Sequence, residues 1–144
     1  MDIVMRWSAM SWIVAGAVVA CLTGSVIADQ AKGNPEAAKI KNPVAATPES
    51  VAAGKKAYDS YCAGCHAPEG QGGLILSITE DKGLPPPATL NDDEWDHGGT
   101  DGEVFTVIRE GVAPDYVMGP WKDRLPVQEI WNIVNYIRSV AVKK

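Results

Sequence analysis

The pentapeptide Cys62-Ala63-Gly64-Cys65-His66 decides how the rest of this chain is interpreted. Two cysteines at this spacing can form thioether bonds to the two vinyl groups of one haem, and a histidine directly after the second cysteine can bind the iron. The motif therefore predicts a covalent haem c that is attached through Cys62 and Cys65, with His66 as one axial ligand.

Three other uses of the motif compete with haem attachment. A thioredoxin-like redox pair needs a preceding strand in a βαβ unit, whereas a helical pattern precedes Cys62. A zinc ion needs four ligands, and the adjacent Cys65 and His66 are awkward partners on one tetrahedral ion. A plain disulfide stays open for a chain outside the cytoplasm. Haem attachment is favoured because the chain carries an export pattern and a helix leads into the motif.

Haem iron has a second axial position, for which Met118 is the predicted ligand. The other three methionines lie near the N-terminus, at Met1, Met5 and Met10. Met118 lies in a loop over 111–121 that is rich in Gly and Pro and can present a side chain to the haem. His97 is the alternative ligand, although its four acidic neighbours are typical of a solvated surface histidine.

The N-terminus has the pattern of a targeting segment. Arg6 precedes a run without charged residues over 7–28, and Val26-Ile27-Ala28 resembles a signal-peptidase site. The sequence predicts a signal peptide over 1–28, and two alternatives stay open: a lipid anchor at Cys21, or an uncleaved span, which takes ~20 apolar residues. All three place the remaining chain outside the cytoplasm, and we expect a periplasmic protein.

The rest of the chain predicts an all-α fold. Residues 29–47 lack apolar periodicity and are interpreted as a flexible linker, which leaves 48–144 as the folded domain. Helix signals are a start at Thr47-Pro48-Glu49, a capping box from Thr100 to Glu103, and a last helix from about Pro126. The Gly- and Pro-rich region 67–90 is loop-like, with a short apolar piece at 74–78.

Charge excludes some classes of partner. The chain of 144 residues has a formal net charge of −5, which argues against nucleic-acid binding and against a polybasic membrane contact. Residues 80–103 hold eight acids and one lysine, so this run is either a docking surface or a solvated face. We expect redox proteins with a basic or apolar docking face as partners, and a monomeric carrier.

The order of a helix, CxxCH, a proline-bearing loop, a methionine loop and an aromatic-rich last helix resembles the class I mono-haem c-type cytochromes, over about residues 48–141. The resemblance implies three to five helices around one haem, with Gly54 and Tyr58 on the first helix meeting Trp131 and Tyr136 on the last. It also implies that a proline carbonyl orients His66, and the candidates are Pro86 and Pro87. Three aromatic side chains are candidates for the haem crevice, with plain core packing as the alternative: Trp95, Tyr116 and Trp121.

The family resemblance implies a single-electron carrier rather than an enzyme. Residues 90–121 are similar to acidic periplasmic cytochromes that serve quinoprotein alcohol dehydrogenases. This implies a periplasmic dehydrogenase as donor and a terminal oxidase or other protein as acceptor. Two alternatives stay open: a haem subunit of a larger oxidoreductase complex, and a gas-binding or peroxidatic haem protein in which Met118 is not a ligand.

Overall fold

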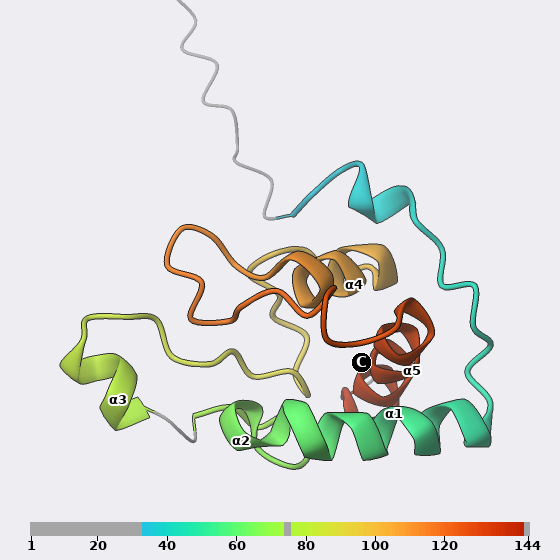
Figure 1. Cartoon of the computed structure of the whole chain (residues 1–144), viewed down its shortest axis with the longest axis horizontal. Helices are drawn as coiled ribbons and strands as arrows, with labels where there is room; N and C mark the ends of the chain where they lie inside the picture. The colour runs from blue at the N-terminus through green and yellow to red at the C-terminus, as the bar shows by residue number, and fades with distance from the viewer. Residues whose placement is uncertain (1–32, 74–75, 143–144) are drawn as a thin grey trace, which may run out of the picture.

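The computed structural model describes residues 33–73 and 76–142, and of residues 76–78 the backbone alone. This part of the chain forms a short 3-10 helix and five α-helices, which are η1 (Ala37–Lys39), α1 (Pro48–Tyr61), α2 (Ala63–His66), α3 (Leu76–Asp81), α4 (Asp101–Glu110) and α5 (Val127–Val140). It contains no strand (Figure 1). The prediction of an all-α fold with three to five helices is confirmed.

The predicted signal peptide or anchor over 1–28, with Cys21, lies outside the described residues. Within the described ranges, every helix is too short or too polar to cross a lipid bilayer.

The helix boundaries follow the sequence signals. Thr47 caps α1, because its Oγ1 accepts a hydrogen bond from Ser50 N at 3.2 Å. Thr100 and Glu103 form the predicted capping box at the start of α4, and Gly111 ends that helix with a φ of +76°. The loop region contains one helix, α3, which begins inside the apolar piece at 74–78.

Helices α1 and α5 pack directly against each other near the middle of α1 (Figure 1). A Cβ atom at Gly54 would collide with the backbone carbonyl oxygen of Asn132, so only glycine permits this approach. One helical turn further on, the rings of Tyr58 and Tyr136 lie 5.0 Å apart. This contact supports the interpretation of Gly54, Tyr58 and Tyr136 from the family resemblance.

Trp131 takes part in a different contact from the one expected. Its ring stacks on Phe105 of α4, with 3.9 Å between ring centroids and 10° between ring planes. Residues 131 and 136 are five positions apart, which separates them by about 140° around an α-helix. Helix α5 therefore presents Tyr136 to α1 and Trp131 to α4, and both side chains are buried.

Residues 33–47 correct that part of the linker predicted over 29–47, and its first residues, 29–32, lie outside the described ranges. Ala37 is buried, and Gly102 of α4 is glycine because a Cβ there would collide with the carbonyl of Ala37. Asn34 N donates to Glu103 Oε1 at 3.0 Å. The segment therefore binds the domain through backbone atoms and amide side chains, which leave no apolar periodicity in the sequence.

A buried amide holds the second half of this segment. Asn135 of α5 is 5% exposed, and its Nδ2 donates to Ser50 Oγ at 2.7 Å and to Val44 O at 3.2 Å. Its Oδ1 accepts a hydrogen bond from Asn42 Nδ2 at 2.8 Å. Because the buried Asn135 side chain bonds to Asn42, Val44 and Ser50, residues 42–50 have a defined path across α5.

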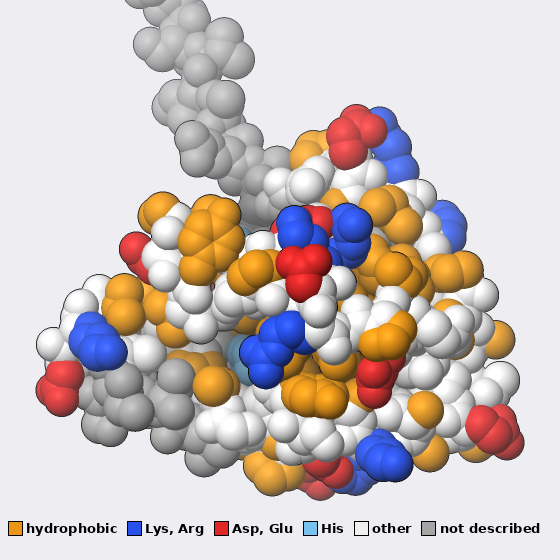
Figure 2. Space-filling view, viewed as in Figure 1, with side chains coloured by type: hydrophobic (Ala, Val, Ile, Leu, Met, Phe, Trp, Pro, Cys, Tyr) orange, Lys and Arg blue, Asp and Glu red, His pale blue; other side chains and the backbone are white. Residues whose placement is uncertain are grey.

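Charged side chains of both signs are interspersed on the face shown in Figure 2. Among the described residues, exposed ion pairs include Lys55 with Asp59 at 2.7 Å and Lys122 with Glu110 at 2.7 Å. Exposed pairs of this kind add little to stability. The described residues on the face drawn in Figure 2 form no large patch of one sign.

The substitution Gly54→Ala tests the close approach of α1 to α5. At an open helical site this change stabilises a protein by up to ~1 kcal/mol, because alanine is the better helix former. Here we expect a loss of about 1–3 kcal/mol, since the new methyl group overpacks the contact with Asn132. Chemical denaturation of the holo-protein measures the difference. The matched control is Ala53→Gly on the exposed side of α1, for which a loss of ~1 kcal/mol is expected; a gain for Gly54→Ala would contradict the packing argument.

The substitution Glu103→Gln tests the hydrogen bonds at the start of α4. The bond from Thr100 N is the largest effect on the pKa of Glu103 and lowers it, whereas burial acts in the opposite direction. A pKa that folding lowers gives stability above the pKa of the unfolded chain, and this stability is lost as the pH falls through the folded pKa. We expect Glu103→Gln to be less stable than wild type at pH 7, and the gap to shrink below about pH 4. Thermal unfolding at both pH values measures the gap, and a gap that does not depend on pH would contradict the assignment.

Candidate functional site

The two cysteines and the histidine of the motif lie on one turn of chain where α1 passes into α2. Cys62 caps α1, with its N–H bonded to Tyr58 O at 2.8 Å, and its own carbonyl accepts from Cys65 N at 3.0 Å and His66 N at 2.9 Å. Both thiols are free; Cys62 is half-buried and Cys65 is exposed. Burial raises the pKa of the Cys62 thiol to about 12, so this thiol is protonated at neutral pH.

His66 is oriented through one ring nitrogen. The side chain is 9% exposed, and its Nδ1 lies 2.9 Å from the carbonyl oxygen of Ala88. Because a carbonyl only accepts, Nδ1 carries the proton, which leaves the lone pair of Nε2 for a metal. Burial lowers the pKa of His66, against the opposing effect of this hydrogen bond. The imidazole is therefore neutral at pH 7, as iron ligation requires.

The predicted carbonyl of Pro86 or Pro87 is corrected to that of Ala88. Leu90 N donates to Gly70 O at 2.6 Å, and Thr89 Oγ1 donates to Gln71 O at 3.2 Å. These bonds align the chain after the prolines with the loop that follows His66. The alignment depends on pairing between distant segments, so the sequence of three consecutive prolines could not show which carbonyl meets the ring.

Two tyrosine hydroxyls hold the chain that follows His66. Tyr58 Oη donates to Ala67 O at 3.0 Å, and Tyr136 Oη donates to Pro68 O at 2.8 Å. Ala67 has a φ of +64°, which is unfavourable for a residue with a Cβ. The two hydroxyl contacts stabilise this turn. The sequence analysis predicts helix packing for these two tyrosines but not the role of their hydroxyl groups. The signal for that role is the presence of Tyr rather than Phe at a core position.

The loop that carries Met118 is closed at its base by backbone hydrogen bonds. Val112 N donates to Met118 O at 2.9 Å, and Trp121 N is shared between Ile108 O and Arg109 O at 3.2 Å each. Met118 is half-buried and packs against the core cluster. Gly111 has a φ of +76°, and a Cβ there would lie 2.7 Å from Met118 O. The end of α4 therefore defines the position of this loop.

The three candidate crevice aromatics have different surroundings. Trp121 is half-buried, with its ring 5.5 Å from that of Tyr61 next to Cys62. Trp95 is half-buried and has the guanidinium of Arg138 5.0 Å from its ring. Tyr116 is exposed. The structure thus places the Trp121 ring against that of Tyr61 beside the cysteine motif, and crevice roles for Trp95, Tyr116 and Trp121 all stay predictions.

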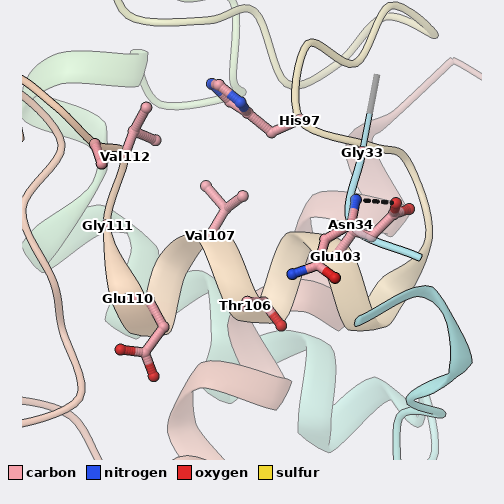
Figure 3. A pocket seen from close by; sticks show the side chains of 10 residues that line it. Gly33, Asn34, His97, Glu103, Thr106, Val107, Glu110, Gly111 and Val112 are labelled. Atoms are coloured by element: carbon pink, nitrogen blue, oxygen red, sulfur yellow. Dashed lines mark hydrogen bonds between the residues drawn. The ribbon is translucent and has the colours of Figure 1, made fainter. Parts of the chain in front are cut away.

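His97 is exposed and lines a pocket of about 260 Å³ over α4 (Figure 3). In Figure 3 it lies across the pocket from the hydrogen bond between Asn34 and Glu103. Neither His66 nor Met118 lines this pocket. Among the described residues, no group of three or more His, Cys, Asp or Glu side chains could hold a metal ion by itself.

These donors fit a haem c. A neutral imidazole with a satisfied Nδ1 can ligate iron, two free thiols at CxxC spacing can form the thioether bonds, and a thioether side chain is available on a separate loop. Cys62 and Cys65 would hold the porphyrin, and His66 offers a nitrogen for the iron.

The chain is similar to known proteins over most of its helical domain. Residues 49–137 match the family model described as cytochrome c oxidase, cbb3-type, subunit III. The cbb3-type cytochrome c oxidase subunit CcoP of Azospirillum sp. (strain B510) is 32% identical over 100 residues, which cover 69% of this chain and 32% of that protein. The chain thus matches about a third of the length of its curated relatives.

Solved structures of c-type cytochromes have the same fold as this chain. Cytochrome cL from the marine methylotrophic bacterium Methylophaga aminisulfidivorans superposes with a TM-score of 0.54 at 27% identity, over 65% of this chain and 55% of that one. Cytochrome cL from Hyphomicrobium denitrificans has the same fold, with a TM-score of 0.53 at 21% identity over 76% of this chain and 64% of that one.

The CxxCH motif, the oriented His66 and the class I fold therefore agree with the family match, which covers more than half of the chain. The chain belongs to the c-type cytochrome family described as cytochrome c oxidase, cbb3-type, subunit III, and its cofactor is a haem c attached through Cys62 and Cys65.

Proposed function

We propose that this protein is a one-electron carrier whose haem iron is bound by His66 on one side and by Met118 on the other. Electron transfer by haem c is the general activity of its family. The observation that carries the finer proposal is the 2.9 Å contact of His66 Nδ1 with Ala88 O, which leaves Nε2 available for one axial position. The half-buried thioether of Met118, on a loop closed against α4, is the donor proposed for the other.

When bound, the haem supplies a reversible change of its iron between the ferric and ferrous states. His66 contributes a neutral nitrogen whose direction is held by the Ala88 carbonyl. Met118 contributes a soft sulfur, which favours the ferrous state and raises the reduction potential. With His66 and Met118 both holding the iron, oxygen and peroxide would find no open coordination site. The residues on both sides are held by packing and hydrogen bonds, so electron transfer needs little rearrangement of the chain.

The proposed location is the periplasm, with a dehydrogenase, for example a quinoprotein, as donor and a terminal oxidase or another redox protein as acceptor. Support comes from the export pattern at the N-terminus and from the similarity to oxidase subunits and to a cytochrome cL. Two acids of the run 80–103 have structural roles, because Glu103 caps α4 and Asp101 pairs with Arg138 at 2.7 Å. A docking role for this run therefore depends on its remaining acids.

A second candidate is that this chain is the haem-bearing part of a larger oxidoreductase rather than a free monomeric carrier. The observation that favours it is that its curated relatives are described as subunits of cbb3-type oxidases. Size-exclusion chromatography of the natively purified protein distinguishes the two candidates. We expect a monomer, and stable co-purification with other redox subunits would favour the second candidate.

The substitution Met118→Ala tests the axial ligation. We expect the ferric holo-protein to change from a six-coordinate low-spin spectrum to a high-spin one. The reduction potential should fall by on the order of 0.1 V, because axial ligands set haem potentials over a range of ~0.8 V. Absorbance spectra and a potentiometric titration measure both effects. The matched variant is His97→Ala, which should change neither; a low-spin spectrum that survives Met118→Ala and is lost in His97→Ala would assign the ligand to His97 instead.

A pair of Gly→Ala changes tests how the loop positions Met118. At Gly111 the φ is +76° and a Cβ would lie 2.7 Å from Met118 O, whereas at Gly119 the nearest other atom would be 4.0 Å away. We expect Gly111→Ala to weaken binding of the iron by Met118, seen as a fraction of high-spin haem, and to cost about 1–3 kcal/mol in stability. Gly119→Ala should retain the wild-type spectrum. Equal spectra for the two variants would contradict control of the ligand by the α4 end.

A further inference from the structure

The Met118 loop and the cysteine motif belong to parts of the chain that meet through one ring contact. Tyr61 is the last residue of α1 and directly precedes Cys62, and Trp121 follows Met118 by three positions. The two rings have centroids 5.5 Å apart and planes tilted by 56°. This is a favourable arrangement for two aromatic rings, which attract edge to face at 4.5–7 Å.

The hydrogen bonds at the base of the loop tie it to α4 and not to the motif. They join Val112 with Met118, and Trp121 and Lys122 with Arg109 at the end of α4. The motif, by contrast, is held by α1 and by the Tyr58 and Tyr136 hydroxyls. Both segments also pack against the same core cluster, and the ring contact of Tyr61 with Trp121 adds a direct link between them.

Trp121 is well placed to provide this contact. Its ring is half-buried and packs against the core cluster, and the guanidinium of Arg124 lies 4.3 Å from the ring centroid. Its carbonyl also accepts hydrogen bonds from Arg124 N and Leu125 N, at 2.9 Å each. Trp121 is therefore fixed with respect to the chain that leads into α5.

Tyr61 contributes little to the core. Its side chain is 44% exposed, in contrast to Tyr58 on the same helix, which is 1% exposed. Tyr61 lies outside the core cluster, and its ring packs against that of Trp121. Removal of this ring is thus expected to leave the fold intact, so its effect on the iron ligand can be measured separately from folding.

We propose that Tyr61 and Trp121 form a clasp that holds the Met118 loop against the Cys62 end of α1, and that the clasp sets how readily Met118 leaves the iron. Both are positioning residues, because they act through Met118. The inference rests on the proposed ligation of the iron by His66 and Met118. A ring contact of this kind changes an opening equilibrium by about two- to tenfold.

Imidazole binding to the ferric holo-protein tests the clasp, because imidazole reaches the iron when Met118 has left it. We expect Tyr61→Ala to bind imidazole up to about tenfold more tightly than wild type, with an unchanged low-spin spectrum before addition. Tyr61→Phe keeps the ring and should behave like wild type. The free energy of unfolding of Tyr61→Ala should fall by no more than the free energy of loop opening obtained from the imidazole affinities, whereas a larger fall would indicate a general loss of stability and not a clasp.

A double-mutant cycle with Trp121→Leu isolates the ring contact. We expect Tyr61→Ala to have no further effect on imidazole affinity once Trp121 is replaced. The matched control is Val127→Ala, which removes an exposed apolar side chain from the start of α5 and should leave the affinity unchanged.

Imidazole affinity of Tyr61→Ala equal to that of wild type would overturn the clasp, and so would additive effects in the cycle. Failure of the underlying ligation has a different signature. In that case Met118→Ala would leave the wild-type spectrum and the wild-type imidazole affinity unchanged, and the clasp would be contradicted together with the proposed ligation.

Discussion

The close approach of α1 to α5 at Gly54 is the constraint on which the rest of the structure depends. Because a Cβ at Gly54 would collide with the Asn132 carbonyl, the two helix backbones meet more closely than any side chain at this position would allow. This approach brings the rings of Tyr58 and Tyr136 together, and their hydroxyls then reach the two carbonyls that follow His66. The position of the haem-binding motif thus follows from a contact at Gly54, which precedes Cys62 by eight residues along the chain.

The two sides of the haem site are supported in different ways. The cysteine and histidine side rests on helices, buried tyrosines and the Ala88 carbonyl. The proposed Met118 side rests on a loop closed by backbone hydrogen bonds to the end of α4. In the proposed ligation, a nitrogen oriented by a hydrogen bond on one face and a soft sulfur on the other suit a carrier that changes oxidation state with little change of shape.

Most of the fold could be predicted from short-range patterns. The start at Thr47-Pro48, the capping box of Thr100 with Glu103 and the glycine at the end of α4 are local signals, and each has its expected role in the structure. The segment over 33–47 could not be predicted in this way, because backbone and amide groups hold it to α4 and α5 without an apolar repeat. Helix α5 directs Trp131 towards α4 and Tyr136 towards α1, and these directions likewise depend on where the neighbouring helices lie.

The sequence by itself determined the cofactor and its attachment, because thioether formation needs two cysteines at a local spacing and a histidine beside them. It also determined the helices, whose caps and periodicity are local. Only the tertiary structure decided which carbonyl orients His66 and which aromatic ring meets the Met118 loop. Both are contacts between distant segments, Ala88 with His66 and Trp121 with Tyr61, and their partners are chosen by packing and by backbone pairing rather than by residue type.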